Sequence, residues 1–370
     1  MSISNGSLVR NAWYVVGTSE DVGRSLQQCW LLDEPVVVFR AEAGTPVVLA
    51  DRCSHRRYPL SKGTLVGDRL VCGYHGFTYA CDGRCIAVPG QDRVPSRARL
   101  RSYPVHERDG WLWAWAGASA RAEVGAVPSL PWMSDPGWAH STGFHRVGAR
   151  YGLLLDNLLD LSHEAYVHPT SIGTPEIAHT PITVRTDGDK VYVQRVMVGV
   201  ECPPLFTKAM GLSTPIDRWQ TVEYIAPSTI VVHVAAAPAG TSDEPTHQLK
   251  IVNAITPAGD TRTSYFFGAC RNFRIDDDSV TELLRTANHR VFAEDVEALE
   301  AQEAMVATDH GDQFECAVKC DGGVVHARRV IERLAEAERA NLRECDDDRL
   351  QFGEPPASHR PRAGSRRSRD

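Results

Sequence analysis

Two pairs of residues in the first quarter of the chain can bind a metal centre. Cys53 and His55 are separated by one residue, and after a gap of sixteen residues Cys72 and His75 are separated by two. Each pair offers one thiolate and one neutral imidazole. Together they supply four ligands from two short loops, which is a complete ligand set.

Two kinds of centre accept such a set. In a Rieske [2Fe-2S] cluster two histidines replace two cysteines on one iron, which raises the reduction potential because imidazole is neutral. The alternative is a Cys2His2 zinc site. Zinc fingers usually place both cysteines in one pair and both histidines in the other, whereas each pair here is mixed. The pattern therefore favours a Rieske cluster held by all four residues.

A second group of potential ligands follows near the middle of the chain, at Asn157, Asp160, His163 and His168. In a continuous helix the first three would share one face because they are three residues apart. The two histidines are five apart, roughly 140° around a helix. Both could therefore reach one ion only if the helix bends or stops, and Pro169 favours a stop.

Two histidines and one carboxylate form the facial triad of non-heme Fe(II) oxygenases, which leaves coordination positions open for O2. We predict the carboxylate within residues 291–303, where a helix would place Asp295 at the edge of its apolar stripe. A buried carboxylate needs a hydrogen-bonding partner or a metal. We select Asp295, keep Glu303 in reserve, and expect Glu294 and Glu297 to point away.

The elements that must position these residues fall into two groups. Residues 30–120 have the pattern of short β-strands, and a helix is expected over 151–167. Residues 180–270 return to strands and residues 277–341 are mainly helical, a pattern that predicts an α+β fold. Three tryptophans with period-two spacing are expected to pack in a core or an interface: Trp111, Trp113 and Trp115.

We expect three segments along the chain: a first domain over residues 1–120, a second over 121–345 and a disordered basic tail over 346–370. The 370 residues are 42% hydrophobic with a formal charge of -7, which argues against a general nucleic-acid binder. There is no signal peptide and no apolar run of about 18 residues, so we expect a cytoplasmic protein without a membrane anchor.

With both groups of ligands in view, the sequence resembles the Rieske non-heme iron oxygenases, specifically the oxygenase components related to vanillate O-demethylase and dicamba monooxygenase. The resemblance covers nearly the whole chain and is most specific at the paired ligands. Other shared segments are Asn11-Ala12-Trp13-Tyr14, Pro59-Leu60-Ser61, Gly110-Trp111-Leu112-Trp113, Ile216-Asp217-Arg218-Trp219-Gln220 and the run from Phe292 to Gln302.

The resemblance implies a Rieske domain joined to a helix-grip catalytic domain, in which an antiparallel sheet and helices enclose a mononuclear iron. It also implies a head-to-tail homotrimer whose electrons pass from one subunit's cluster to its neighbour's iron. On that model the Asp160 carboxylate bridges His75 and His163, and Asn157 lies near the iron without being a firm ligand. One departure is Ser54, where many members have proline.

The function implied is that of a terminal oxygenase, which uses O2 and electrons from NAD(P)H to oxidise a small aromatic substrate. O-demethylation of a methoxylated aromatic or C–H hydroxylation is favoured, and ring cis-dihydroxylation is the alternative. The chain lacks the GxGxxG motif of a dinucleotide site, so a separate reductase with flavin and a [2Fe-2S] cluster is expected. From other classes, a Rieske electron carrier with a non-catalytic second domain and a zinc-stabilised binding module stay open. Pocket candidates are Val232, Val234, Ile255 and Phe267.

Overall fold

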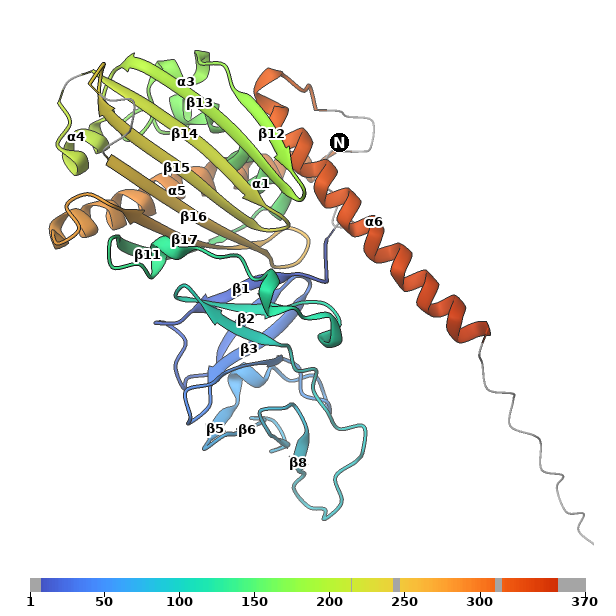
Figure 1. The fold of residues 1–370 in the computed structure, drawn as a ribbon. Coiled ribbons are helices and arrows are strands. Elements are labelled where there is room, and N and C mark those ends of the chain that lie inside the picture. Colours follow the sequence, from blue (N-terminus) through green and yellow to red (C-terminus); the bar gives the residue numbers. More distant parts are fainter. Residues whose placement is uncertain (1–7, 214, 242–246, 310–314, 352–370) are drawn as a thin grey trace, which may run out of the picture.

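The computed structural model describes residues 8–213, 215–241, 247–309 and 315–351. Its N-terminal part contains three small antiparallel sheets, which lie below the large sheet in Figure 1. The first has the order β1-β10-β9, the second β2-β3-β4 and the third β5-β6-β7-β8. Their bounds are β1 Trp13–Thr18, β2 Gln27–Leu31, β3 Glu34–Arg40, β4 Pro46–Ala50, β5 Thr64–Val66, β6 Arg69–Val71, β7 Thr78–Tyr79, β8 Cys85–Ala87, β9 Val105–Arg108 and β10 Trp111–Trp115.

The C-terminal part is built on one seven-stranded antiparallel sheet with the order β11-β17-β16-β15-β14-β13-β12. Six of these strands have 9 to 11 residues, and β13 and much of β14 alternate buried positions with more exposed ones, as strands with two different faces do. The strands are β11 Ala139–Val147, β12 Thr183–Asp187, β13 Lys190–Val200, β14 Ile216–Ile225, β15 Thr229–Pro238, β16 His247–Pro257 and β17 Thr263–Arg271.

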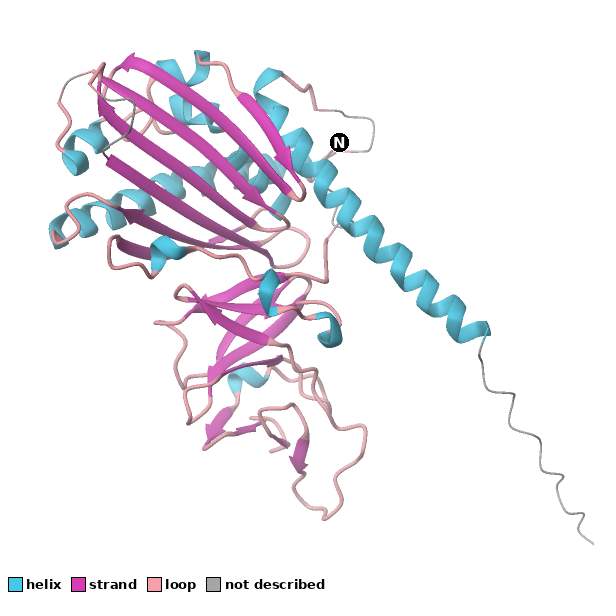
Figure 2. Ribbon diagram, viewed as in Figure 1, coloured by secondary structure: helices cyan, strands magenta, loops and turns pink. Residues whose placement is uncertain are grey.

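Helices gather on one face of this sheet, which Figure 2 shows as cyan ribbons behind the magenta strands. Short 3-10 turns, η2 Leu60–Lys62, η3 Ser119–Arg121, η4 Val124–Ala126, η5 Pro131–Met133 and η7 Lys319–Asp321, connect the elements. The helical segments are α1 Tyr151–Leu159, η6 Leu161–His163, α2 Glu164–Val167, α3 Pro175–His179, α4 Pro204–Met210, α5 Asp278–Val306 and α6 Gly322–Gln351. The expected α+β architecture, a β-rich N-terminal domain and an antiparallel sheet covered by helices, is confirmed.

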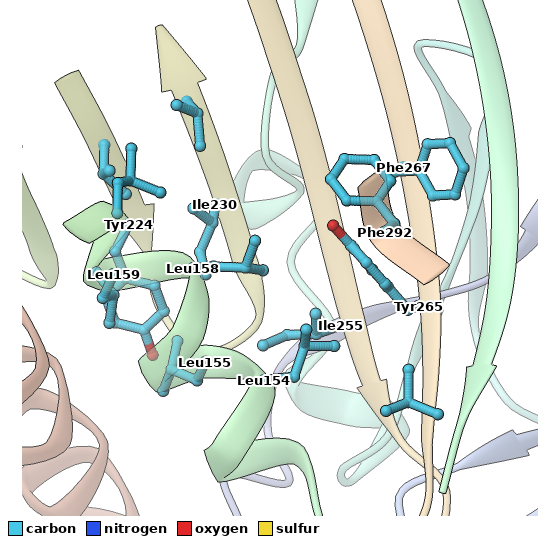
Figure 3. Close-up of a cluster of buried hydrophobic side chains, with 14 of the residues drawn as sticks. Leu154, Leu155, Leu158, Leu159, Tyr224, Ile230, Ile255, Tyr265, Phe267 and Phe292 are labelled. Carbon is cyan, nitrogen blue, oxygen red and sulfur yellow. The ribbon is translucent and has the colours of Figure 1, made fainter. Parts of the chain in front are cut away.

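The main core lies between α1, α5 and the inner face of the large sheet. Leu154 and Leu158 of α1 point toward Ile230 and Ile255 of the sheet, and Phe292 of α5 meets Phe267 of β17 (Figure 3). The rings of Phe267 and Phe292 lie 4.6 Å apart, edge to face. These contacts with the sheet hold α1 and α5 in place, and the candidate ligands lie on α5 and in the segment that follows α1.

A second core joins the two parts of the chain. The tryptophans of β10 pack with Trp13 of β1 against Val231, Val252 and Phe266 on the outer face of the large sheet. The expectation that the tryptophans serve packing is confirmed, because all three are buried in this interface. A hydrogen bond from Thr256 Oγ1 to the Val15 carbonyl, 2.7 Å long, adds a polar link across it.

Three details differ from or add to the sequence expectation. The helix expected over 151–167 is interrupted, because α1 ends at Leu159 and a 3-10 turn precedes α2. Helix α6 continues through residues 346–351, which the sequence pattern assigns to the basic tail, and residues 352–370 lie outside the described part. Among the described residues, no helix combines the length and the apolar character needed to cross a membrane.

Candidate metal centres

The first candidate centre lies at the tip of the N-terminal part. Cys53 follows β4 and Cys72 follows β6, and both thiols are buried, each residue being 2% exposed. The rings of His55 and His75 lie at the surface, with centroids 4.7 Å apart. The loops approach closely, since a Cβ on Gly63 would lie 2.3 Å from the Val71 carbonyl oxygen.

This arrangement fits a Rieske cluster. Two adjacent buried thiols can hold one iron inside the domain, and two adjacent exposed imidazoles can hold the second iron at the surface. The Tyr79 hydroxyl lies 3.2 Å from Cys53 Sγ, and it also contacts Ser54 through the backbone N–H and Oγ. The exposed histidine edge is where an electron can leave the cluster.

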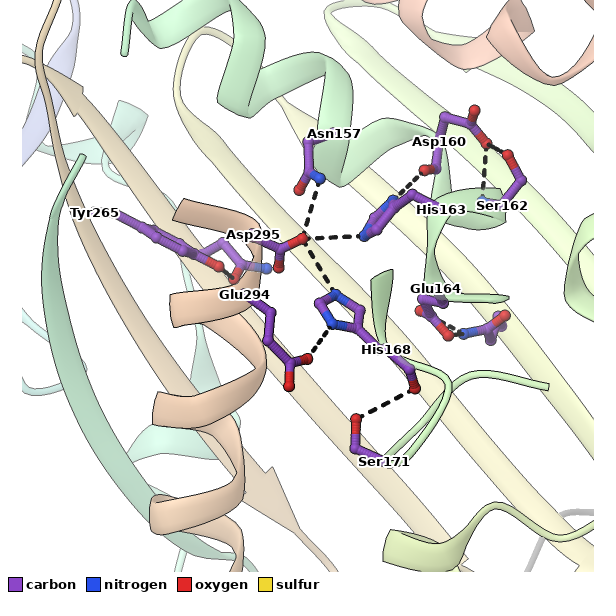
Figure 4. A network of polar contacts seen from close by, with 12 residues as sticks. Asn157, Asp160, Ser162, His163, Glu164, His168, Ser171, Tyr265, Glu294 and Asp295 are labelled. Carbon is purple, nitrogen blue, oxygen red and sulfur yellow. Dashed lines mark hydrogen bonds and ion pairs between the residues drawn. The ribbon is translucent and has the colours of Figure 1, made fainter. Parts of the chain in front are cut away.

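The second candidate centre lies under the large sheet, where α5 meets the segment after α1 (Figure 4). One ligand atom from each of His163, His168 and Asp295 lies within 4.8 Å of the other two. Asp295 Oδ1 is 3.3 Å from His163 Nε2 and 3.1 Å from His168 Nε2. The structure thus brings together the two histidines and the carboxylate that we selected, in the donor set of a 2-His-1-carboxylate site.

The other nitrogen of each imidazole is held by a separate acceptor. His163 Nδ1 lies 2.7 Å from the main-chain carbonyl oxygen of Asp160, and His168 Nδ1 lies 2.7 Å from Glu294 Oε2. Each acceptor fixes the Nδ1–H tautomer, which leaves the Nε2 lone pair free for a metal. The expectation that Glu294 points away from the site is therefore wrong.

The neighbouring polar residues of the motif take different positions from those of a continuous helix. Asn157 Nδ2 donates to Asp295 Oδ1 at 3.1 Å, while its own Oδ1 is buried without a partner among the described residues. Asp160 has extended backbone angles and its carboxylate accepts from Ser162 N and Oγ. Asn157, Asp160 and His163 therefore do not share a helix face, because α1 ends at Leu159 and the Asp160 side chain caps the start of the following 3-10 turn.

Charge in the site is set by the two histidines and the carboxylate. Burial alone would raise the pKa of Asp295, but hydrogen bonds from His163 and His168 hold it at about 2. Burial disfavours protonation of the histidines, yet the bond and the charge of Asp295 raise the pKa of both above the ordinary value. The site thus presents an ionised carboxylate, and a divalent metal would displace the histidine protons.

Glu303, the reserve carboxylate, serves another purpose. Its side chain accepts from Arg150 Nε at 2.8 Å and from Nη2 at 2.7 Å, which accounts for its burial. No atom of Glu303 joins the three-ligand group among the described residues.

A cavity opens directly onto the three ligand atoms. Its walls are mostly apolar, so it suits a small organic ring. Val232 and Val234 line it as expected, whereas Ile255 and Phe267 share the inner face but pack in the core. The main apolar walls come from α1, α4, β15 and β16: Leu158, Leu205, Phe206, Val232, Leu249 and Ile251.

Four polar side chains interrupt these walls. Glu164 and Arg218 form a buried ion pair 3.0 Å long, and Asn253 accepts from Tyr265 and donates to the Ile230 carbonyl. Asn288 differs, because its Nδ2 is buried and has no partner within the described residues. Sequence reasoning missed Glu294 and Asn288, although Asn288 precedes Asp295 by seven residues and so shares its face of α5.

Comparisons with known proteins agree with both centres. Residues 12–104 match the model of the Rieske [2Fe-2S] domain, and residues 147–337 match that of the vanillate O-demethylase oxygenase C-terminal domain. The vanillate O-demethylase oxygenase subunit of Pseudomonas sp. (strain HR199 / DSM 7063) is 36% identical over 89% of this chain and 96% of its own. The oxygenase component of dicamba O-demethylase from Stenotrophomonas maltophilia is 33% identical over 90% of this chain and all of its own.

Solved structures lead to the same family. Dicamba monooxygenase bound to 3,6-dichlorosalicylic acid superposes with a TM-score of 0.86 at 32% identity, covering 90% of this chain and 99% of the other. A second structure of dicamba monooxygenase, with non-heme iron and dicamba, superposes with a TM-score of 0.77 at 30% identity and covers the same fractions of the two chains. These matches span both domains and argue against an electron carrier with an inert second domain and against a zinc module. The chain is an oxygenase with a Rieske [2Fe-2S] cluster and a mononuclear iron site, and it belongs to the vanillate O-demethylase oxygenase family.

Proposed function

We propose that this oxygenase removes the methyl group from a methoxylated aromatic compound, with the cluster held by Cys53, His55, Cys72 and His75. In the same proposal His163, His168 and Asp295 hold the iron. The observation that carries it is the apolar cavity that opens onto these three ligand atoms. Relatives that act on vanillate and dicamba support the choice of reaction.

The iron, when bound, supplies the coordination positions for O2, and the cluster supplies electrons. The protein contributes position. Asp160 O and Glu294 orient the two imidazoles, and Asn157 holds Asp295 Oδ1 through its amide. The apolar walls exclude water from the substrate, which limits loss of oxidising equivalents to solvent.

The substrate ring would lie against Val232, Val234 and Leu249 with its methoxy group toward the ligand atoms. Asn288 would bind a polar substituent at the other end of the ring. It lies two turns before Asp295 on α5, about 10 Å along the axis at 1.5 Å per residue. A single substituted benzene ring fits between two groups at that separation.

The overall reaction balances as one methoxyarene, one O2, two electrons and two protons giving one phenol, one formaldehyde and one water. The electrons come from a separate reductase, which the relatives' description as oxygenase components supports. We further propose a reductase with flavin and a [2Fe-2S] cluster, which takes electrons from NAD(P)H.

The same proposal includes a cytoplasmic homotrimer. Figure 1 places the tip formed by β5, β6 and β8 at the end of the molecule away from α1 and α5, so transfer between two subunits suits the chain better than transfer within one. In that assembly Asp160 would lie between His75 of one copy and His163 of the next. The seven described cysteines other than Cys53 and Cys72 are free thiols, which supports a reducing compartment.

The test is turnover of a panel of methoxybenzoates, methylbenzoates and unsubstituted benzoate with the purified oxygenase, a reductase of the flavin and [2Fe-2S] type and NADH. Formaldehyde and the phenol should form in equal amounts from at least one methoxybenzoate. A cis-diol or a benzylic alcohol as the sole product across the panel would replace demethylation by dihydroxylation or hydroxylation.

A further inference from the structure

A second cavity lies next to the cavity that opens onto the ligand atoms, between α4 and the first half of α5. Its volume is about 150 Å³, and Ser171, Leu205, Ala287 and Arg290 are among its lining residues. Leu205 also lines the first cavity, as do the residues that directly follow the other three in the chain. The two cavities therefore lie back to back, and the Leu205 side chain separates them.

The outer rim of this second cavity is cationic. Lys208, Thr286 and Arg290 line it and are exposed, so solvent reaches it from the surface. In the described part of the chain no carboxylate forms an ion pair with Lys208, and Arg290 Nε lies 4.0 Å from Glu294 Oε1, at the outer limit of such a pair. Two cations thus flank the opening, although the chain as a whole carries a formal charge of -7.

A third cavity reaches the ligand group from another side, between α1, α5 and α6. Its lining includes His163 and four carboxylates, those of Asp156, Asp160, Glu315 and Asp321. Arg328 also lines it and is ion-paired with both Asp156 and Glu315. The local charge of this opening is negative, so it repels an anion.

We propose that the cavity between α4 and α5 is the entrance for the substrate, and that Lys208 and Arg290 make it selective for aromatic anions such as carboxylates. The inference rests on the proposed function, because it takes the inner cavity as the binding site of the ring. A cationic opening on an acidic protein raises the local concentration of an anion. Leu205, which moves aside by a change of rotamer, then admits the ring to the inner cavity.

The order of residues along α5 also sets the orientation of the ring. Arg290 lies at the entrance, and Asn288, two residues earlier, lines the inner cavity with an Nδ2 that has no partner among the described residues. A carboxylate attracted by the two cations therefore trails as the ring enters and accepts from Asn288 at the outer end. The methoxy group enters first and faces His163, His168 and Asp295.

The experiment measures how fast an anionic and an uncharged probe of similar shape enter the oxygenase. 5-Methoxysalicylate and 5-methoxysalicylamide both fluoresce, so stopped-flow mixing gives their association rate constants without turnover or a reductase. At an ionic strength of about 0.01 M, Lys208→Gln combined with Arg290→Gln should slow the anion about tenfold and leave the amide unchanged. At about 1 M, where the Debye length is about 3 Å, the double variant and the wild type should bind the anion at the same rate.

Matched variants separate the charge of the entrance from net charge and from the position of the route. Arg285→Gln removes a cation from the same helix, but Arg285 is ion-paired with Glu282 and lines neither cavity, so the anion should associate as in the wild type. Thr286→Trp places an indole in the entrance and should slow both probes several-fold. Gln302→Trp places the same group in the acidic opening and should slow neither probe.

Equal rates for the anion in the wild type and the double variant at low salt would overturn the proposal, as would slowing by Gln302→Trp in place of Thr286→Trp. Either result leaves demethylation standing as the proposed function. Failure of both probes to bind the wild-type oxygenase would instead count against the inner cavity as an aromatic site and would overturn both proposals. Iron counts on each variant show that the mononuclear site is filled.

Discussion

Replacement of Glu294 tests whether the second centre is a metal site built around His168. The Glu294 carboxylate accepts from His168 Nδ1 at 2.7 Å, a short charge-assisted bond. Without it the imidazole is free to carry its proton on Nε2, the nitrogen that faces Asp295, and that tautomer cannot bind a metal. Iron binding would then have to reverse the tautomer and reorient the ring.

Loss of such an outer hydrogen bond typically lowers metal affinity 10- to 100-fold, which corresponds to about 1.4–2.8 kcal/mol. The Glu294 side chain is 31% exposed, so solvent screens part of its charge. We therefore expect Glu294→Ala to weaken iron binding about 30-fold and Glu294→Gln about threefold, since a glutamine oxygen still accepts from Nδ1–H.

The assay is competition for the mononuclear iron by a chromogenic Fe(II) chelator under anaerobic conditions, with the visible spectrum of the cluster recorded on the same sample. The matched control is Glu297→Ala, one turn further along the exposed face of α5. Wild-type iron affinity in Glu294→Ala would refute the role given to Glu294, and equal weakening in Glu297→Ala would make the effect a general charge effect.

Five further changes test other parts of the structure. Asp295→Ala should leave only the iron of the cluster. Glu303→Gln should retain mononuclear iron and lower the free energy of unfolding by about 1–2 kcal/mol in chemical denaturation, because the partly buried Arg150 loses the charge of its partner but keeps an oxygen acceptor. His233 and Lys190 hold the pKa of Glu223 at about 2. This depressed pKa stabilises the fold by about 1–3 kcal/mol above pH 4.5, and the stabilisation is lost as the pH falls toward 2. Glu223→Gln should therefore reduce the dependence of the unfolding free energy on pH between 2 and 4.5. Asn288→Leu should lower kcat/KM about tenfold for methoxyarenes with a second polar substituent and spare anisole, and equal losses would contradict a contact with that substituent. Asp160→Asn should keep both metals, since the carbonyl that holds His163 remains, but slow cluster oxidation in single-turnover measurements; an unchanged rate would exclude the carboxylate from the electron path.

The sequence was sufficient to propose the ligands because their chemistry is local. Cys53, His55, Cys72 and His75 lie in two short loops, so residue type and spacing carry most of the information. Asp295 could be chosen from helix periodicity, since a carboxylate beside an apolar stripe requires a partner. The same periodicity could not exclude Glu303, whose partner Arg150 lies more than 150 residues away in the chain.

What the sequence could not predict depends on contacts between distant elements. Glu294 lies about 100° from Asp295 around α5, so the helix alone suggests that it faces elsewhere. It reaches His168 because that residue lies beyond the end of α2 and approaches α5 from the side. On β15, alternation separates Val232 and Val234 from His233, but only the fold shows which face meets the cavity.

The break after α1 also links the iron site to the wall of the substrate cavity. His163 ends the 3-10 turn, and Glu164, the next residue, is buried and bonded to Arg218 and Gln220 of β14 at 3.0 Å each. A buried ion pair adds little net stability, because desolvation offsets most of its attraction. Its consequence here is geometric: the ligand segment is fixed to the sheet that carries the cavity wall, so a ring resting on that wall is held at a constant distance from the ligand atoms.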